Sequence, residues 1–197
     1  MKSSSIITYT SESERLILRI LNESNASQVL DFQKKNAALF EKFEPDRMTQ
    51  FYTLNYQQTL LSLEQTMFLK KTALRFWVYC KQQPNTIIGT ISFNFINQFP
   101  FHSCQLGYKF DPDYWHHGFA SESIQTAIQI VHPYLNLHRI EALVLASNEP
   151  SIRLLERLHF YKEGISRECI QMNGVWTDHV RYVLILPDND TNIQTVR

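Results

Sequence analysis

The chain has 197 residues, a length that fits one domain, and its 19 Lys and Arg are balanced by 19 Asp and Glu. This balance argues against the strongly charged surfaces of proteins that bind nucleic acid or anionic membranes. No apolar run approaches the ~20 residues that cross a bilayer, and the first residues lack the apolar segment of a signal peptide. We therefore expect a cytoplasmic protein without nucleic-acid or membrane partners.

The chain opens with a pattern of one strand and two helices. A polar, Ser-rich arm over residues 1–12 precedes an alternating apolar segment over 15–21, which predicts a strand. Helical patterns follow over 25–43 and over about 52–71, and the intervening Glu44-Pro45-Asp46 breaks the helix. In the second helix the apolar stripe that we expect to face the core is Tyr56, Leu60, Leu63, Met67 and Phe68.

Three strands and a helix are predicted next. Residues 75–80 and 86–96 are rich in β-branched and aromatic side chains, with a turn over 81–85, as in a hairpin. Another strand covers 104–110. From 120 to 135 the apolar period is helical, and Pro133 should end or kink this helix.

The last third of the chain predicts a buried strand, a short helix and a hairpin. The nearly continuous apolar run over 139–146 indicates a strand buried on both faces beside a parallel neighbour. Asn148 suits the N-cap of the helix that follows, with Pro150 in its first turn. Strands over 164–171 and 179–186 flank Asn173-Gly174, a strong hairpin signal, and a polar tail follows Pro187. The order β–α–α–β–β–β–α–β–α–β–β predicts an α/β fold on a mixed sheet.

The three cysteines, Cys80, Cys104 and Cys169, are widely separated, and each lies in a predicted strand. An odd number without paired spacing argues against a disulfide framework and against a zinc site. We expect buried, reduced thiols and no metal.

The loop from His116 to Ser121 precedes the predicted helix over 120–135. A helix N-terminus offers unpaired N–H groups and the positive end of a dipole, which suits a phosphate. Gly118 allows the backbone to approach an anion closely, and the small residues after Phe119 keep that approach open. The loop lacks the Gly and Lys pattern of nucleotide triphosphatases and the three glycines of dinucleotide-binding folds. His116 and His117 have no Cys or carboxylate partner at ligand spacing, so we expect them at the phosphate rim or facing solvent.

An ordered series of motifs resembles the GNAT superfamily of N-acetyltransferases, and within it the ribosomal-protein-alanine N-acetyltransferase branch. The resemblance covers about residues 14–187 of a single domain with polar tails, and it implies a central mixed, twisted sheet flanked by helices. The motifs are Leu106-Gly107-Tyr108, Tyr114 to Glu122, His138-Arg139-Ile140, Asn148-x-x-Ser151, Leu154 to Phe160, Glu163-Gly164 and Asn173 to Val180.

The resemblance implies that acetyl-CoA is the acetyl donor, and it implies where acetyl-CoA binds. Its pantetheine arm would lie between the strands over 104–110 and 139–146, which part there, and Asn148 would donate or accept a hydrogen bond. The residues implied in cofactor binding are Leu106, Gly107, Tyr108, His116, His117, Gly118, Phe119, Ala120, Ser121, Asn148 and Ser151.

The same resemblance places catalysis at Gln105, Tyr108 and Ser151. Acetyl transfer to an amine needs an acceptor for the amine proton and donors for the carbonyl oxygen and the leaving sulfur. Backbone N–H groups over 106–108 would serve the oxygen, and Ser151 would either serve the sulfur or only satisfy the backbone of the first helical turn. Many relatives carry Glu where this chain has Gln105, and glutamine cannot accept a proton at neutral pH. The proton acceptor stays open between water, Glu122, Tyr108 and Glu141.

Two further positions depart from the superfamily pattern. Leu155 stands where many members have a tyrosine acid, and His159 stands where a glycine is usual before Phe160. These departures keep a second class of function open, namely an acyl-CoA-binding or sensor domain without catalysis. A nucleotide-binding module ranks third.

The acceptor is expected to be an amine, and the resemblance favours a protein N-terminal α-amine over an antibiotic, polyamine or amino acid. The aromatic candidates listed at the end of this paragraph have an alternative role, which is packing in the interior. Asp178 and His179 are expected either to contact the substrate or to support the hairpin. A monomer or homodimer is expected. Candidates to line the amine site are Phe43, Phe51, Tyr52 and Trp176, with Glu41, Glu44 or Asp46 to attract a cation.

Overall fold

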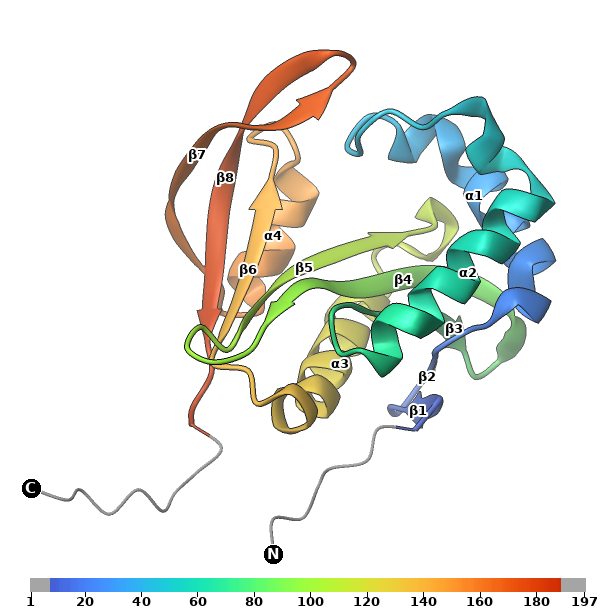
Figure 1. Ribbon diagram of the computed structural model, residues 1–197, viewed down its shortest axis with the longest axis horizontal. Helices are drawn as coiled ribbons and strands as arrows, with labels where there is room; N and C mark the ends of the chain where they lie inside the picture. The colour runs from blue at the N-terminus through green and yellow to red at the C-terminus, as the bar shows by residue number, and fades with distance from the viewer. Residues whose placement is uncertain (1–7, 189–197) are drawn as a thin grey trace, which may run out of the picture.

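The computed structural model describes residues 8–188, and within them all strands form one eight-stranded sheet (Figure 1). The predicted element order is confirmed, with one short strand added at the start. The helices and strands are β1 (Thr10–Glu12), β2 (Leu16–Arg19), α1 (Ala26–Phe40), α2 (Leu54–Leu69), β3 (Leu74–Cys80), β4 (Gln83–Asn97), β5 (Ser103–Phe110), α3 (Phe119–Leu135), β6 (Arg139–Val144), α4 (Glu149–Arg157), β7 (Tyr161–Met172) and β8 (Val175–Ile185).

The sheet is mixed, as predicted. Its strand order is β1-β2-β3-β4-β5-β6-β8-β7, and β5 and β6 pair in parallel while the other neighbours pair antiparallel. The parallel pair follows from the α3 crossover, because a helix between two strands returns the chain to the same edge. In the strand order the parallel junction lies between the fifth and sixth of the eight strands, and α3 packs against both of them in the main core.

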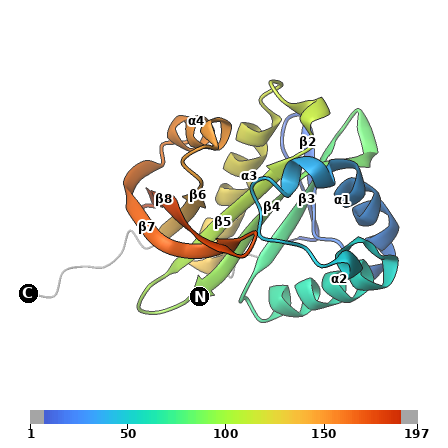
Figure 2. The same cartoon turned by 90° about the horizontal axis from the view of Figure 1, so that it is seen from above.

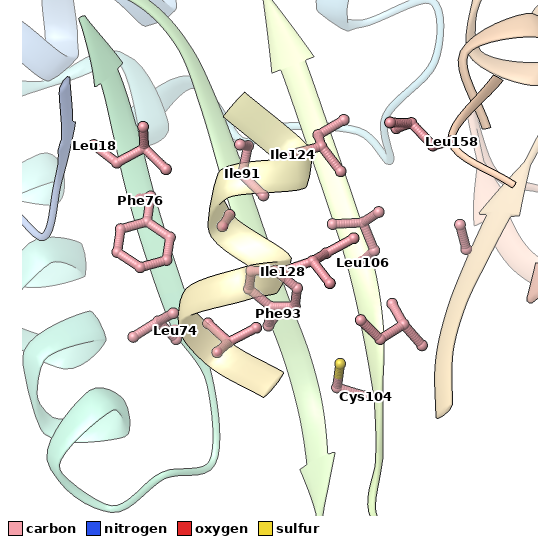
Figure 3. Packing of buried hydrophobic residues seen from close by; sticks show 14 of the residues in the cluster. Leu18, Leu74, Phe76, Ile91, Phe93, Cys104, Leu106, Ile124, Ile128 and Leu158 are labelled. Atoms are coloured by element: carbon pink, nitrogen blue, oxygen red, sulfur yellow. The ribbon is translucent and has the colours of Figure 1, made fainter. Parts of the chain in front are cut away.

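Helices cover both faces of the sheet (Figure 2), with α1 and α2 on one side and α3 and α4 on the other. The larger core lies under α3 and α4, where Phe76, Phe93 and Leu106 of the sheet meet Ile124 and other residues of α3 (Figure 3). A smaller core under α1 and α2 includes Trp77 and Tyr79. Alternation along each strand sends neighbouring side chains to these two cores.

Helix α3 has the buried face that its sequence predicts, because Ile124, Ala127, Ile128, Val131 and Leu135 are all buried. Pro133 does not end the helix at its own position, since α3 continues to Leu135 and stops at Asn136 in a left-handed conformation.

The expected stripe of α2 is wrong in part. Leu63 and Met67 are exposed, and the buried residues of the helix are Gln57, Leu61 and Phe68. The cause lies in Gln57, which is buried in the core with its side-chain N–H donating to the carbonyl of Phe51, while its Oε1 has no hydrogen-bond partner among the described residues. A prediction based on apolar residues alone therefore selected the wrong face of α2.

Three further features differ from the sequence prediction. Thr10–Glu12, expected in a polar arm, forms β1 against β2, while residues 1–7 and 189–197 of the expected tails lie outside the described residues. The β3–β4 connection is limited to residues 81–82 because β4 already begins at Gln83. Strand β6 is buried on one face only, since Ile140, Ala142 and Val144 alternate with half-buried residues.

The thiols behave as expected at two of three positions. Cys80 and Cys104 are buried, and burial raises the pKa of Cys104 to about 12. Cys169 is half-buried, contrary to the expectation, because it lies on the edge strand β7. Over residues 8–188 we find no helix with the length and apolarity to cross a membrane, and no cluster of three or more His, Cys, Asp or Glu side chains that could hold a metal ion.

Candidate functional site

The parallel strands β5 and β6 part after three residue pairs and leave a wedge in the sheet. Their register pairs are Ser103↔Arg139, Cys104↔Ile140 and Gln105↔Glu141. Beyond these pairs β5 stays bonded to β4, and β6 stays bonded to β8 (Figure 1). Backbone groups that face the wedge lack a strand partner, and strand edges of this kind bind extended molecules. The predicted parting of the two strands is confirmed.

Helix α3 begins at the open end of this wedge, after the loop that follows β5. Gly118 is its N-cap with φ of 77°, and no side chain caps the helix. The first N–H groups of a helix have no partner within it, so they and the dipole favour an anion here. The structure thus places the loop over 116–121 where an anion at the end of an extended ligand would lie.

An ion-pair network fastens this loop to the edge of the sheet. The Arg15 guanidinium donates to the His117 carbonyl at 3.0 Å and to Glu122 Oε2 at 2.7 Å. Glu122 Oε1 accepts from Ser13 Oγ at 2.6 Å and from the Arg15 N–H at 2.9 Å. Burial alone raises the pKa of Glu122, but these hydrogen bonds and the Arg15 charge outweigh it and hold that pKa below its usual value. Glu122 therefore positions the loop and is a poor proton relay.

The two histidines of the loop, His116 and His117, are both exposed. His116 has a positive φ of 63°, and the His117 ring lies 5.6 Å from that of Phe119, centroid to centroid. Neither ring is part of a metal-ligand cluster in the described region. Their positions agree with the expectation of a rim or solvent-facing role.

Tyr108 and Ser151 meet across the wedge. The Tyr108 hydroxyl lies 2.6 Å from Ser151 Oγ and also donates to the Ser151 carbonyl at 3.2 Å. Asn148 is the N-cap of α4, as predicted, because its Oδ1 accepts from the Ser151 N–H at 3.3 Å. Burial raises the pKa of Tyr108 to about 12, although the Ser151 hydrogen bond opposes it. The tyrosine is therefore a protonated donor at neutral pH, and the Ser151 hydroxyl serves Tyr108 rather than the helix cap.

The opposite face of the wedge points toward α1 and carries charge. Lys109 Nζ lies 2.8 Å from Glu44 Oε1 and 3.0 Å from Gln33 Oε1. Desolvation lowers the pKa of Lys109 to about 8, against the opposing effect of Glu44. Glu141 accepts from Arg139 Nε at 2.8 Å. Alternation along β5 puts Gln105 on this same face.

Most candidates for the acceptor wall already have internal partners. Phe51 is buried, and Tyr52 donates to Glu41 at 2.8 Å. Asp46 accepts from the Asn173 N–H at 3.0 Å, which joins the tip of the β7–β8 hairpin to the α1–α2 connection. Of the four aromatic candidates, Phe43 and Trp176 have exposed side chains.

The remaining departures from the superfamily pattern have structural explanations. Leu155 is fully buried in the main core, so this position packs the helix. His159 has a φ of 64°, a left-handed conformation that favours glycine, at the end of α4. Asp178 accepts from the Glu168 N–H and from Arg167, both at 2.8 Å, and His179 is buried. These last two residues support the hairpin.

Sequence reasoning missed two parts of this site. Arg15 and Ser13 were not singled out, because their partner Glu122 lies more than a hundred residues along the chain and no local pattern joins them. The pairing of Tyr108 with Ser151 was also not foreseen, although each residue was a candidate. The sequence signals for this pair were two separate motifs, one containing Tyr108 and the other containing Ser151.

Comparison with known proteins agrees with this arrangement. Residues 15–161 match the family model of the acetyltransferase (GNAT) domain. The chain is 30% identical over 175 residues to "Probable N-acetyltransferase YjcK" of Bacillus subtilis (strain 168), a match that covers 89% of this chain and 96% of that protein. It is 28% identical over 176 residues to the ribosomal protein uS5-alanine N-acetyltransferase of Escherichia coli (strain K12), covering 89% and 90%.

A solved structure shares the fold as well. The crystal structure of ribosomal-protein-S5-alanine acetyltransferase from Vibrio fischeri is similar with a TM-score of 0.85 and 30% sequence identity. The match covers 93% of this chain and 98% of that one.

Proposed function

The chain belongs to the GNAT acetyltransferase family and is an acetyl-CoA-dependent N-acetyltransferase; we propose that its acceptor is a protein N-terminal α-amine. The observation that carries this proposal is the similarity, over about nine-tenths of the chain, to two enzymes named for acetylating a ribosomal-protein alanine. The wedge between β5 and β6 is the proposed site of transfer.

The chain's own groups fit acetyl-CoA at this wedge. The unpaired edges of β5 and β6 suit the amides of a pantetheine arm, and the N-terminus of α3 suits a pyrophosphate. Gly118 provides close access for the anion at that helix end. When bound, acetyl-CoA supplies an activated thioester. We assign the N–H groups over 116–121 to the pyrophosphate, and the side chain of Asn148 to the pantetheine.

The proposed catalytic groups at the narrow end of the wedge are backbone N–H groups and a pair of hydroxyls. N–H groups over 106–108 stabilise the negative charge that develops on the acetyl oxygen. Tyr108 and Ser151 carry two hydroxyl protons, and one of them, that of Tyr108, can be donated to both the hydroxyl and the carbonyl oxygen of Ser151. The other can be donated to the leaving sulfur. Because burial keeps Tyr108 protonated at neutral pH, the pair retains this donor.

An α-amine suits a site in which Gln105 replaces a carboxylate. The ordinary pKa of an α-amine is about 7.7–8.0, against about 10.4 for lysine. Near pH 7.5 roughly a third of an α-amine is neutral, whereas roughly one lysine in a thousand is. The acceptor therefore needs less help in losing a proton than a lysine side chain would.

The test is an acceptor panel with purified protein and acetyl-CoA. We would follow thiol release and locate the acetyl group by mass spectrometry on peptides that begin with Ala, Ser or Thr. Matched controls are the same peptides with a blocked N-terminus, and a polyamine. We expect transfer to the free N-terminus alone. Turnover on the polyamine alone would move the acceptor to small molecules, and CoA binding without turnover on any amine would identify an acyl-CoA-binding module.

A further inference from the structure

Gln105 leaves the proton of the attacking amine without a carboxylate on β5, and a carboxylate stands directly across from it. We propose that Glu141 on β6 accepts this proton, either directly or through one water. The proposal rests on the acetyl transfer to an amine described above. It assigns Glu141 the role that a glutamate at position 105 has in many relatives.

The register of the sheet places Glu141 at the reaction end of the wedge. Gln105 and Glu141 form the last parallel pair before β5 and β6 separate. Paired residues of neighbouring strands lie about 5 Å apart and point to the same face of the sheet. Cys104 and Ile140, the preceding pair, are buried toward α3 and α4, so Gln105 and Glu141 face the other side. Glu141 on β6 thus offers a carboxylate on the strand next to β5, where many relatives have a glutamate at the position of Gln105.

Two arginines hold the Glu141 carboxylate in place and leave some of its acceptor sites unoccupied. Arg139 Nε donates to Oε1 at 2.8 Å, and Arg181 Nη1 lies 3.3 Å from Oε2. A carboxylate has about four acceptor sites, so sites remain for an ammonium N–H or a water. The side chain is 26% exposed, so solvent reaches it. The group is both oriented and reachable.

The neighbouring groups support this arrangement. Arg139 is itself bound to Glu163 at 2.6 Å, and Arg181 Nε donates to Ser166 Oγ at 3.1 Å, so both arginines are fixed from β7. Other carboxylates on this side are engaged elsewhere. Glu44 binds Lys109 and Arg47, and Asp46 binds the hairpin tip. Glu141 is the carboxylate beside the point where the strands part.

The amine nitrogen forms its bond to the acetyl carbon while the carbon–sulfur bond breaks, and the electron pair of that bond stays on sulfur. The nitrogen loses one proton to Glu141. The Tyr108–Ser151 pair gives one proton to the sulfur and is restored from solvent. Glu141 releases its proton to solvent after the amide has left, so no other reactant is needed.

The decisive variant is Glu141→Gln, which keeps the size and can keep one of the two arginine contacts through its single acceptor oxygen, but cannot accept a proton. A general base contributes typically 10²–10⁴-fold, so we expect kcat to fall at least about 100-fold while the Kd for CoA changes less than about threefold. The matched control is Glu64→Gln, which likewise removes a carboxylate from an arginine, Arg75, but lies on α2 and outside the wedge. It should keep kcat within about threefold.

A rescue experiment separates proton transfer from mere support. Gln105→Glu added to Glu141→Gln returns a carboxylate across the same pair, and we expect at least about a tenfold recovery of kcat. If Glu141→Gln unfolds, Glu141→Asp takes its place in the test. Aspartate keeps the charge on a side chain that is shorter by one methylene, and kcat should fall about 10- to 100-fold. Glu141→Gln with near wild-type kcat, or without any rescue by Gln105→Glu, would overturn the role of Glu141 alone. Wild-type protein inactive on every amine would overturn the proposed function with it.

Discussion

Gly118 offers a direct way to test the anion site at the start of α3. Its φ of 77° lies in the left-handed region, where a side chain costs about 1–2 kcal/mol. A Cβ there would lie 3.4 Å from Arg15 Nη2, which is ordinary van der Waals contact. Gly118→Gln and Gly118→Glu carry the same backbone strain and nearly the same volume. They differ in charge alone, so their ratio isolates electrostatics.

The size of the charge effect follows from Coulomb's law. A carboxylate about 6 Å from one phosphate charge, at an effective dielectric constant of about 20, costs roughly 3 kcal/mol. That energy corresponds to roughly a 100-fold higher Kd for CoA in Gly118→Glu than in Gly118→Gln. Salt should shrink the ratio, because both charges are near solvent.

The assay is calorimetric titration with CoA at low and at high ionic strength, with thermal melts of both variants as the folding control. We expect equal melting temperatures within a few degrees, both below wild type. Equal Kd values for the two variants at low salt would refute the placement of the pyrophosphate at this helix end.

Three further variants test the hydroxyl pair, the ion pair of the loop and the packing of β4. Ser151→Ala should lower kcat about tenfold or more with little change in the Kd for CoA, since Asn148 still caps its N–H; an unchanged kcat in steady-state assays would reduce Ser151 to a structural residue. The pKa of Glu122 is held below its usual 4.5 in the folded protein, so its stabilisation is present above that pH and lost as the pH falls through the native value. Denaturant titrations from pH 7 to pH 3 should therefore show the advantage of wild type over Glu122→Gln vanish in acid, and an advantage that is independent of pH would contradict this. Gly89→Ala would place a Cβ against the Phe110 ring and should cost about 1–3 kcal/mol in unfolding free energy, whereas unaltered stability would show that the ring moves freely aside.

The sequence was sufficient to predict features that depend on residues close together in the chain. The buried face of α3 follows from its 3.6-residue period, and Asn148 caps α4 where its side-chain chemistry predicts. Asn173 and Gly174 both have positive φ, as a tight hairpin requires. These features depend on neighbours within a few residues, so a single sequence carries them.

Contacts between distant segments were not accessible in the same way. The Arg15–Glu122 network joins residues far apart in the chain, and neither residue has a local pattern that identifies the other. The pairing of Gln105 with Glu141 depends on the register of a parallel ladder, which begins wherever the α3 crossover lets the second strand start. The buried face of α2 was mistaken because a hydrogen-bonded glutamine occupies it.

Hydrogen–deuterium exchange with and without CoA tests whether CoA binds between β5 and β6, because it reports where the ligand pairs with the backbone. We expect slower exchange in β5 after Gln105, in the loop and first turn over 116–121, and at the start of α4, with β1 to β3 unchanged. Protection confined to other parts of the sheet, with these three segments unaffected at saturating CoA, would contradict this placement.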